Sequence, residues 1–308
     1  MNAVILAQYG GPEALVFATH PNPTPAFGEV LIDVKAASIN GADYKVRRGL
    51  GGALDFPYVL GRDFSGIVSG VGPGVSDIRL GEEVFGVLDQ GQEGAYAEKL
   101  VVKAAIIARK PKWLSHVEAA SVALTGLTAL WAIEDTAALQ AGESILIHGG
   151  SGGVGSFAIQ VARFLKADIA TTASAENIEY VKMLGATQVV DYANEDFTEV
   201  VSPCDVVFDT VGGEVQVRSY DVLKPGGRLV RITAAPEGFE PSRLDVKVLR
   251  PAVTRSRGHL ERIVDLLHRE AVRPPNIKCF RLREASEAHR ISETRHLRGK
   301  LVFDLSLG

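Results

Sequence analysis

One short glycine-rich segment constrains the fold of this chain more than any other feature. Residues Ile147–Ser156 read IHGGSGGVGS and contain the pattern G-x-G-x-x-G at Gly150, Gly152 and Gly155. The segment follows an apolar run and opens a run with helical spacing, and this context separates it from an ordinary glycine turn. In such a turn the first glycine permits the tight bend, the second admits a pyrophosphate, and the third lets helix and strand pack closely. The segment predicts a dinucleotide-binding unit whose anion lies at a helix N-terminus.

Apolar runs and helical segments alternate through the middle of the chain, from about residue 116 onward. The runs predict short strands at residues 144–148, 168–173, 187–190, 205–208 and 228–232. After the first run, Phe157, Val161, Phe164 and Leu165 recur at helical spacing on one face. Strands that alternate with helices build βαβ units in a parallel sheet. This region is therefore predicted to be an α/β domain with a doubly wound parallel sheet, the Rossmann arrangement.

The two ends of the chain are richer in strand signals. Residues 30–35 and 66–71 alternate apolar and polar side chains, and glycine and proline interrupt the first part of the chain often. Short strands with frequent turns favour a barrel or a sandwich. The tail carries an amphipathic helix at 259–270 and a strand-like end at 300–305. The tail is therefore expected to return to the first domain. The predicted domains are 1–115 with 258–308, and an inserted domain of 116–257.

Composition excludes several classes of protein. With 46% hydrophobic residues and a net charge of −4, the chain of 308 residues does not have the composition of a disordered protein. The charge gives no general attraction to nucleic acid or to an anionic membrane. Cys204 and Cys279 are too few for a four-cysteine zinc site or a disulfide framework. The apolar run 119–133 is interpreted as a buried helix, and the N-terminal residues lack a signal-peptide pattern, so a cytoplasmic location without membrane attachment is expected.

A set of motifs, taken in order, gives the chain a family resemblance. The motifs are GGPEAL at 10–15, NGADYK at 40–45, GRDFSG at 61–66, the glycine segment, FDTVGG at 208–213, LKPGGR at 223–228 and RGKLV at 298–302. Over nearly its full length the chain resembles the quinone oxidoreductase, or zeta-crystallin-like, branch of the medium-chain dehydrogenase/reductases. The resemblance implies a GroES-like partial β-barrel built from both ends of the chain, with the Rossmann domain inserted between them.

The zinc alcohol dehydrogenases, which are relatives of that branch, carry ligands that this chain lacks. It has Asn40 at their catalytic cysteine position and Gly61-Arg62-Asp63 at their Gly-His-Glu motif, and residues 88–102, their four-cysteine lobe, contain no cysteine. Asp63 alone cannot supply a tetrahedral zinc site, so no metal is expected. Without a Lewis acid, direct reduction of a carbonyl becomes harder. Conjugate hydride transfer to a quinone or enone remains possible, because hydrogen-bond donors can stabilise the enolate oxygen.

Asn40, Tyr44 and Lys45 are the candidate catalytic residues. The Asn40 amide and the Tyr44 hydroxyl are donors for a substrate oxygen, and Tyr44 is also a candidate proton donor. The alternatives are a packing role for Tyr44 and a solvated surface position for Lys45. Asp63 is expected to organise the former metal site by pairing with Arg62 or Lys45, since charges inside a site are usually paired.

The cofactor is expected to be NADPH rather than NADH. Ser174 ends the second predicted strand, where NAD sites place a carboxylate on the ribose 2′-hydroxyl, and a small neutral residue leaves room for a 2′-phosphate. Glu176 and Asn177 argue the other way, because Asn177 stands where NADPH-dependent members place a basic residue. Further cofactor contacts are expected from strand ends, from the glycine segment and from the resemblance. They are Thr125, Gly150, Ser151, Gly152, Gly153, Val154, Gly155, Asn177, Tyr192, Thr210, Val211, Gly212, Ile232, Thr233, Arg298 and Lys300.

Two other functions fit the same motifs. An enoyl-thioester reductase would need a basic rim for a phosphate, for which the candidates are Arg243, Lys247, Arg250, Arg255 and Arg257; a solvated surface is the alternative. A catalytically silent NADPH-binding protein would bind cofactor without turnover. RNA binding has little support, since no basic stripe is interleaved with aromatic residues. The resemblance also implies a homodimer joined by Rossmann edge strands, with residues 244–253 as the candidate edge.

Overall fold

The computed structural model describes residues 1–89, 92, 94–241 and 243–308. The chain forms two compact units, and each unit is assembled from separate segments. The first unit contains residues 1–124, 254–265 and 274–308, and the second contains 125–253 and 266–273. The sequence placed the domain boundaries at 115/116 and 257/258, whereas the units divide inside helix α2 (His116–Leu130) and before helix α7 (Arg257–His268).

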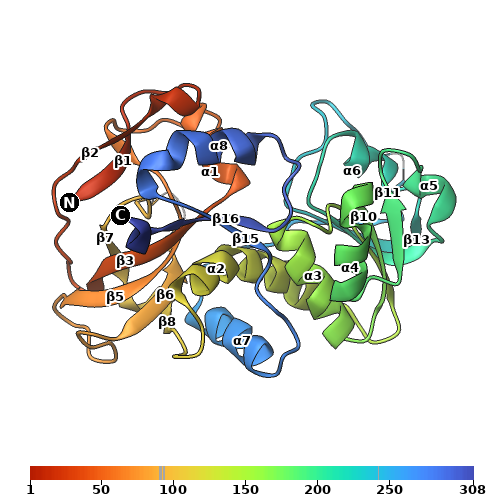
Figure 1. Cartoon of the computed structure of the whole chain (residues 1–308). Coiled ribbons are helices and arrows are strands. Elements are labelled where there is room, and N and C mark those ends of the chain that lie inside the picture. The colour runs from red at the N-terminus through yellow and green to blue at the C-terminus, as the bar shows by residue number, and fades with distance from the viewer. Residues whose placement is uncertain (90–91, 93, 242) are drawn as a thin grey trace. The chain divides into compact units, whose positions relative to one another are not determined.

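The first unit is built around a seven-stranded, mostly antiparallel sheet, whose strands β3, β5 and β6 run side by side in Figure 1. In spatial order its strands are β15 (Ile277–Phe280), β16 (Lys300–Asp304), β3 (Glu29–Ile39), β5 (Asp63–Val71), β6 (Glu83–Val87) and β8 (Ile107–Arg109), and β7 (Lys99–Lys103) also pairs with β3. A second sheet holds β2 (Leu15–Thr19), β1 (Asn2–Leu6) and β4 (Tyr58–Val59). Strand β16 lies antiparallel to β3, so the tail returns to the first part of the chain as predicted.

Alternation along β3 explains why this strand is central to the first unit. Val30, Ile32 and Val34 are buried, while the residues between them are partly exposed. Two register shifts against β5, at Leu31/Ile32 and Val34/Ala36, let the long strand pair with β5, β7 and β16. Short helices complete the unit. They are α1 (Gly41–Arg47), α8 (Ala285–Glu293), η1 (Pro12–Ala14), η2 (Ala104–Ile106), η5 (Leu282–Glu284) and η6 (Leu305–Leu307).

The second unit is a six-stranded parallel sheet, as the sequence predicts. Its order is β11 (Gln188–Asp191), β10 (Asp168–Ala173), β9 (Ser144–Ile147), β12 (Cys204–Asp209), β13 (Leu223–Arg231) and β14 (Lys247–Leu249). Between β9 and β12 the strand order reverses, and ligands of doubly wound sheets bind outside the carboxyl ends at this point. Helices α3 and α4 pack beside β9, β10 and β11 (Figure 1). The helical segments are α3 (Gly153–Phe164), α4 (Ile178–Leu184), α5 (Phe197–Val200), α6 (Glu214–Arg218), η3 (Trp131–Thr136) and η4 (Ala175–Asn177).

The central strands β9 and β12 are buried on both faces. Ile145, Leu146 and Ile147 have no exposed surface, and the same holds for Val206 and Val207. Continuous apolar runs of this kind are typical of parallel strands covered by helices on both sides. The expected α/β class with a doubly wound sheet is therefore confirmed.

One helical stretch among the described residues, His116–Thr136, is long and apolar enough to span a membrane. It has 21 residues and a mean hydropathy of 1.3, and 72% of its most apolar window is buried inside the structure. The helical stretch is longer than the predicted run 119–133, since it begins at His116 and ends with a π-helical segment at Thr136. A core helix has the same composition and the same burial, which agrees with the interpretation from the sequence.

Two buried histidines predict a loss of stability in mild acid. Burial lowers the pKa of His148 to about 3, and burial together with the Arg47 guanidinium lowers the pKa of His289 to about 3. Between pH 6.5 and these values the unfolded chain binds protons that the folded chain does not, so each histidine should remove up to about 1.4 kcal/mol of stability per pH unit as the pH falls. Urea unfolding at pH 7 and pH 5 checks this.

The matched variants are His148→Asn and His289→Gln, with exposed His268→Asn as control. Each buried-site variant should flatten the dependence of the unfolding free energy on pH, while the control keeps the wild-type slope. Equal slopes in all four proteins would show that the buried imidazoles do not govern the acid response.

Candidate functional site

The glycine segment forms the turn from β9 into helix α3. Gly152 is the N-cap of α3, with an extended φ of −72° and ψ of 171°, and the helix begins at Gly153. The first turn of a helix leaves backbone N–H groups without intrahelical partners, and the helix dipole is positive there. Ser151, Gly152 and Val154 are partly exposed, so a ligand can reach this backbone.

At two of the three motif glycines, neighbouring atoms leave no room for a side chain. A Cβ at Gly155 would lie 2.2 Å from the Gly149 carbonyl oxygen, and one at Gly150 would lie 2.1 Å from Thr171 Oγ1. At Gly152 the nearest atom would be 3.4 Å away, so the protein itself leaves this position open. The glycine of the turn with a left-handed backbone is Gly149, which precedes the motif and has a φ of +72°. Gly150 is held by its contact with the neighbouring strand.

Threonine hydroxyls on adjacent strands tie this turn in place. Thr172 Oγ1 accepts a hydrogen bond from the Gly149 N–H at 3.1 Å, and Thr171 Oγ1 donates to the Ile147 carbonyl at 2.6 Å. Thr210 Oγ1, after β12, donates to the His148 carbonyl at 2.7 Å. Neither threonine of β10 was predicted as a site residue. Their position at the carboxyl end of a predicted strand was the signal that could have identified them.

Asp209 brings together the predicted residues at the ends of β12 and β13. Its Oδ1 accepts from the backbone N–H groups of Val211 at 2.8 Å and Gly212 at 2.9 Å, and its Oδ2 accepts from Thr233 Oγ1 at 3.2 Å. Ile232 continues β13 and donates its N–H to the Asp209 carbonyl. Asp209 is fully buried and was not predicted as a site residue.

Polar side chains gather where β10 and β11 end, and the acidic residues Asp191 and Glu176 are among them. Asn177 Nδ2 donates to Ser174 Oγ at 2.8 Å, and the Tyr192 N–H donates to the Ala173 carbonyl at 3.3 Å. Tyr192 is 50% exposed, whereas Asn177 is buried. Glu176 is exposed. The end of β10 therefore carries hydroxyl and amide groups from Ser174 and Asn177, together with the exposed carboxylate of Glu176.

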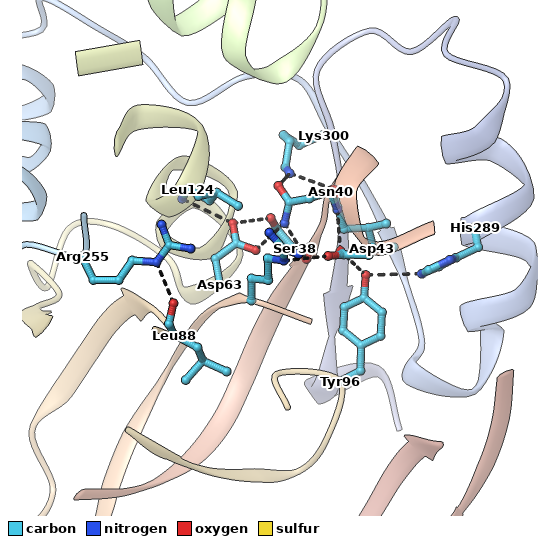
Figure 2. A network of polar contacts seen from close by, with 12 residues as sticks. Ser38, Asn40, Asp43, Asp63, Leu88, Tyr96, Leu124, Arg255, His289 and Lys300 are labelled. Carbon is cyan, nitrogen blue, oxygen red and sulfur yellow. Dashed lines mark hydrogen bonds and ion pairs between the residues drawn. The ribbon is translucent and has the colours of Figure 1, made fainter. Parts of the chain in front are cut away.

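The first unit contains a buried polar network centred on Asn40 and Asp63, which Figure 2 shows. Asp63 begins β5 and is fully buried. Its Oδ1 accepts from Asn40 Nδ2 at 2.7 Å, and its Oδ2 accepts from Ser38 Oγ at 2.7 Å and from the Leu124 N–H at 3.4 Å. Lys300 Nζ donates to Asn40 Oδ1 at 2.7 Å. Both oxygens of the Asp63 carboxylate are thus hydrogen-bonded within the unit, as burial of a charge demands.

A second carboxylate extends the network towards helix α8. Asp43 Oδ2 accepts from the Asn40 N–H at 2.8 Å and from the Tyr96 hydroxyl at 2.7 Å, and Tyr96 lies 3.4 Å from His289 Nε2 (Figure 2). Complete burial raises the pKa of Asp43, although the Arg62 guanidinium and the Tyr96 hydroxyl act in the opposite direction. The N–H contact fixes the start of α1, which presents Asn40 at its N-cap.

The expected partner of Asp63 is wrong. Arg62 lies 3.7 Å from Asp43, and Asp63 is bonded to Ser38, Asn40 and Leu124. Side chains of successive residues at a strand point to opposite faces, so Arg62 and Asp63 do not face each other.

The other candidates from the sequence fall into different environments. Tyr44 is 7% exposed, and its hydroxyl accepts a hydrogen bond from Arg295 Nε at 3.2 Å, so the phenol is a buried polar group rather than a wet surface one. Lys45 is half-buried. Thr125 is buried in helix α2 within the second unit. Arg298 and Lys300 belong to the first unit, and the Lys300 ammonium donates to Ile39 and Asn40.

The residues at the former zinc position do not fit a zinc ion. Both oxygens of Asp63 are occupied by protein donors, and the Lys300 ammonium on Asn40 would repel a cation. Across residues 1–89, 92, 94–241 and 243–308, no group of three or more His, Cys, Asp or Glu side chains is arranged to hold a metal. Gln90, Gly91 and Glu93, in the region of the cysteine lobe, lie outside the described residues.

Two family models match this chain. Residues 26–112 match the alcohol dehydrogenase GroES-like domain, and residues 184–303 match a model described as zinc-binding dehydrogenase. The first match covers the strand-rich part of the first unit, which is therefore GroES-like. The second family model names zinc in its description, and the side chains around Asn40 and Asp63 do not fit a zinc ion.

Curated relatives and solved structures agree with these matches. The NADPH-dependent alkenal/one oxidoreductase of Arabidopsis thaliana is 34% identical over 98% of this chain and 79% of its own. The quinone oxidoreductase from Coxiella burnetii has a TM-score of 0.92 at 35% identity, over 99% of both chains. The Escherichia coli quinone oxidoreductase complexed with NADPH has a TM-score of 0.91 at 28% identity, over 99% of this chain and 100% of its own. Structures described as a NAD-dependent alcohol dehydrogenase and as the CurK enoyl reductase also match, with TM-scores of 0.92 and 0.88.

The glycine turn, the GroES-like unit and the ordered motifs lie in one chain, and a relative that is 34% identical matches 98% of it. The chain belongs to the quinone oxidoreductase branch of the medium-chain dehydrogenase/reductases, a family of oxidoreductases.

Proposed function

We propose that this protein uses NADPH to reduce quinones or α,β-unsaturated carbonyls by hydride transfer, without a metal. The observation that carries the proposal is the open backbone at Gly152, on the first turn of α3, where a pyrophosphate can approach N–H groups. The alkenal/one oxidoreductase and quinone oxidoreductase names of the relatives support the substrate class.

The residues of each unit have separate tasks in this proposal. Bound NADPH supplies the hydride, and the protein supplies binding, orientation and electrostatics. The N–H groups of the first turn of α3, which begins at Gly153, bind the pyrophosphate, and the bare backbone of Gly152 lets it approach. Asn40 Nδ2 donates to the oxygen on which enolate charge develops, where a fixed donor is worth more than in water. The Tyr44 hydroxyl accepts from Arg295, so its own proton is available for that oxygen.

An assay of NADPH oxidation against a panel of quinones, enones and enals tests the proposal. We expect turnover with several acceptors, and no change on addition of zinc or a chelator. Tight NADPH binding without turnover on any acceptor would favour the catalytically silent alternative. Activity that needs zinc would contradict the metal-free part.

The preference for NADPH over NADH rests on the small neutral side chain of Ser174 at the end of β10. We expect Ser174→Asp to weaken NADPH binding at least about tenfold while NADH binding changes less, because a carboxylate repels a 2′-phosphate and accepts from a 2′-hydroxyl. Dissociation constants of both cofactors, measured by quenching of intrinsic fluorescence, check this. Glu179→Gln on exposed helix α4 is the control. Equal weakening of both cofactors in Ser174→Asp would contradict the role of Ser174.

An enoyl-thioester substrate is the second candidate, favoured by the similarity to an enoyl reductase. Three of the five candidate residues for its basic rim donate hydrogen bonds to backbone carbonyls. Arg243 donates to the Tyr220 and Leu223 carbonyls, while Arg255 and Arg257 belong to the first unit, where they donate to the Leu88 and Ile107 carbonyls. Including enoyl-coenzyme A in the acceptor panel separates the two substrate classes.

We also infer a homodimer that forms through β14. This strand is the edge of the parallel sheet and lies within the candidate segment 244–253, where Leu244 is 95% exposed. Lys247 and Pro251 disfavour pairing of this edge with another strand, but they do not prevent it. The molar mass in solution tests the inference, and Val248→Pro, on β14, should then produce monomers.

A further inference from the structure

Lys300 is a buried lysine with a specific set of partners. It begins β16 and is 4% exposed. Its Nζ donates to the Ile39 carbonyl at 2.7 Å and to Asn40 Oδ1 at 2.7 Å (Figure 2). Burial lowers the pKa of Lys300, and the carboxylates of Asp63 and Asp43 oppose this shift. Lysine side chains are rarely buried so completely unless their charge is paired. The contact between the Lys300 ammonium and the Asn40 amide therefore points to a specific role for this lysine.

The nitrogen and the oxygen of the Asn40 amide face side chains of opposite charge. The amide nitrogen donates to Asp63 Oδ1 at 2.7 Å, while the amide oxygen accepts from the Lys300 ammonium. A flipped amide would turn its oxygen towards the Asp63 carboxylate and its NH₂ towards the Lys300 ammonium, and both contacts would be repulsive. The Asn40 amide therefore has one favourable orientation. In most asparagines the amide oxygen and nitrogen can exchange places with little change in the shape of the side chain.

One N–H of the Asn40 amide is left with only a long contact. Asn40 Nδ2 has two hydrogens, and the contact besides Asp63 is the Ser38 carbonyl at 3.5 Å. A bond of that length is weak compared with the usual range of about 2.7–3.2 Å. The second N–H can therefore be given to a substrate oxygen without breaking a strong bond inside the protein.

We propose that Lys300 is a positioning residue, which holds the Asn40 amide so that this N–H is presented to the substrate oxygen. The inference rests on the proposed function for its catalytic consequence, and it replaces the expected contact between Lys300 and the cofactor. Asp63 holds the other end of the same amide. The two charged partners thus fix the direction of a donor that a single partner would leave free to turn.

Steady-state kinetics of Lys300→Met test the positioning role. Loss of one charge-assisted hydrogen bond should lower kcat about tenfold to a hundredfold, with the KM for NADPH unchanged. Lys300→Arg should restore part of the loss. Lys110→Met is the matched control, because Lys110 is also buried in the first unit and its Nζ donates to the Leu114 carbonyl at 2.5 Å. This control should keep the wild-type kcat.

A double-variant cycle shows whether Lys300 acts through Asn40. Asn40→Ala should lower kcat, and adding Lys300→Met should then lower it little further, because the amide to be positioned is already absent. Fully additive losses in kcat would overturn the proposal. A raised KM for NADPH with unchanged kcat would also overturn it, in favour of a cofactor contact.

A magnetic-resonance readout tests the same contact without turnover. The side-chain amide signals of Asn40, identified by their absence in Asn40→Ala, should shift or broaden in Lys300→Met and stay in place in Lys110→Met. Unchanged signals in Lys300→Met would overturn the positioning role. If the wild-type protein reduces no acceptor, the proposed function fails, while the amide signals still decide whether Lys300 orients Asn40.

Discussion

Gly152→Ala is expected to weaken NADPH binding about tenfold to a hundredfold while the fold is retained. The added Cβ would lie 3.4 Å from the Gly149 carbonyl oxygen, an ordinary contact, at a φ of −72° that alanine adopts freely. The methyl group would stand where the pyrophosphate must approach the backbone, and the loss of one hydrogen bond to a charged group accounts for that factor. Titration of intrinsic fluorescence with NADPH measures the change.

Two further glycine variants separate binding from stability. Gly155→Ala should destabilise the protein by about 1–3 kcal/mol, because its Cβ would meet the Gly149 carbonyl oxygen at 2.2 Å and backbone has to move. Gly258→Ala is the control, since its Cβ would have only Ser256 Oγ nearby, at 3.7 Å. Wild-type NADPH affinity in Gly152→Ala would contradict a pyrophosphate site at the start of α3.

Asp63→Asn is expected to lower the free energy of unfolding by about 3–5 kcal/mol, the usual cost of removing one partner from a buried charge arrangement. The carboxylate is fully buried, accepts from Ser38 and Asn40, and is the main opposite charge acting on Lys300. The variant keeps the shape of the side chain but removes its negative charge and replaces one of its two acceptor oxygens with an NH₂ donor. Urea unfolding at neutral pH measures the loss.

The matched control is Asp33→Asn on the surface of the first unit. Asp33 pairs with Lys99, and both side chains are about a third exposed, with 37% and 30% of their surface in solvent. Exposed ion pairs are worth roughly 0–1 kcal/mol, so this variant should stay close to the wild type. Similar losses in the two variants would show that burial of the Asp63 network contributes nothing beyond an ordinary ion pair.

Local sequence patterns were enough to predict the second unit. The glycine turn and the strand ends follow from spacing within short segments, since β9 and α3 are consecutive in the chain. Ser174 and Asn177 could be placed at the end of β10 because the strand boundary itself was predicted correctly. The positive φ of Gly149 could not be predicted in this way, because the motif indicates which glycines are needed but not which residue of the turn takes that conformation.

The network of the first unit could not be predicted in the same way. Asn40 and Lys300 are 260 positions apart, and β16 had to pair with β3 before the two side chains could meet. The sequence identified Asn40 from the missing cysteine and Lys300 from its motif, yet assigned them to different ligands. Asp63 was given the wrong partner because strand register, rather than proximity along the chain, decides which side chains share a face.

Transfer of deuterium from NADPH labelled at the transferable position of its nicotinamide tests the central claim most directly. With a simple enone as acceptor, the proposed reaction places deuterium on the β-carbon of a saturated ketone, and the added proton comes from solvent. Mass spectrometry and magnetic resonance of the product should find the label there and nowhere else. Deuterium on the carbonyl carbon of an allylic alcohol, or a product without label, would contradict the account.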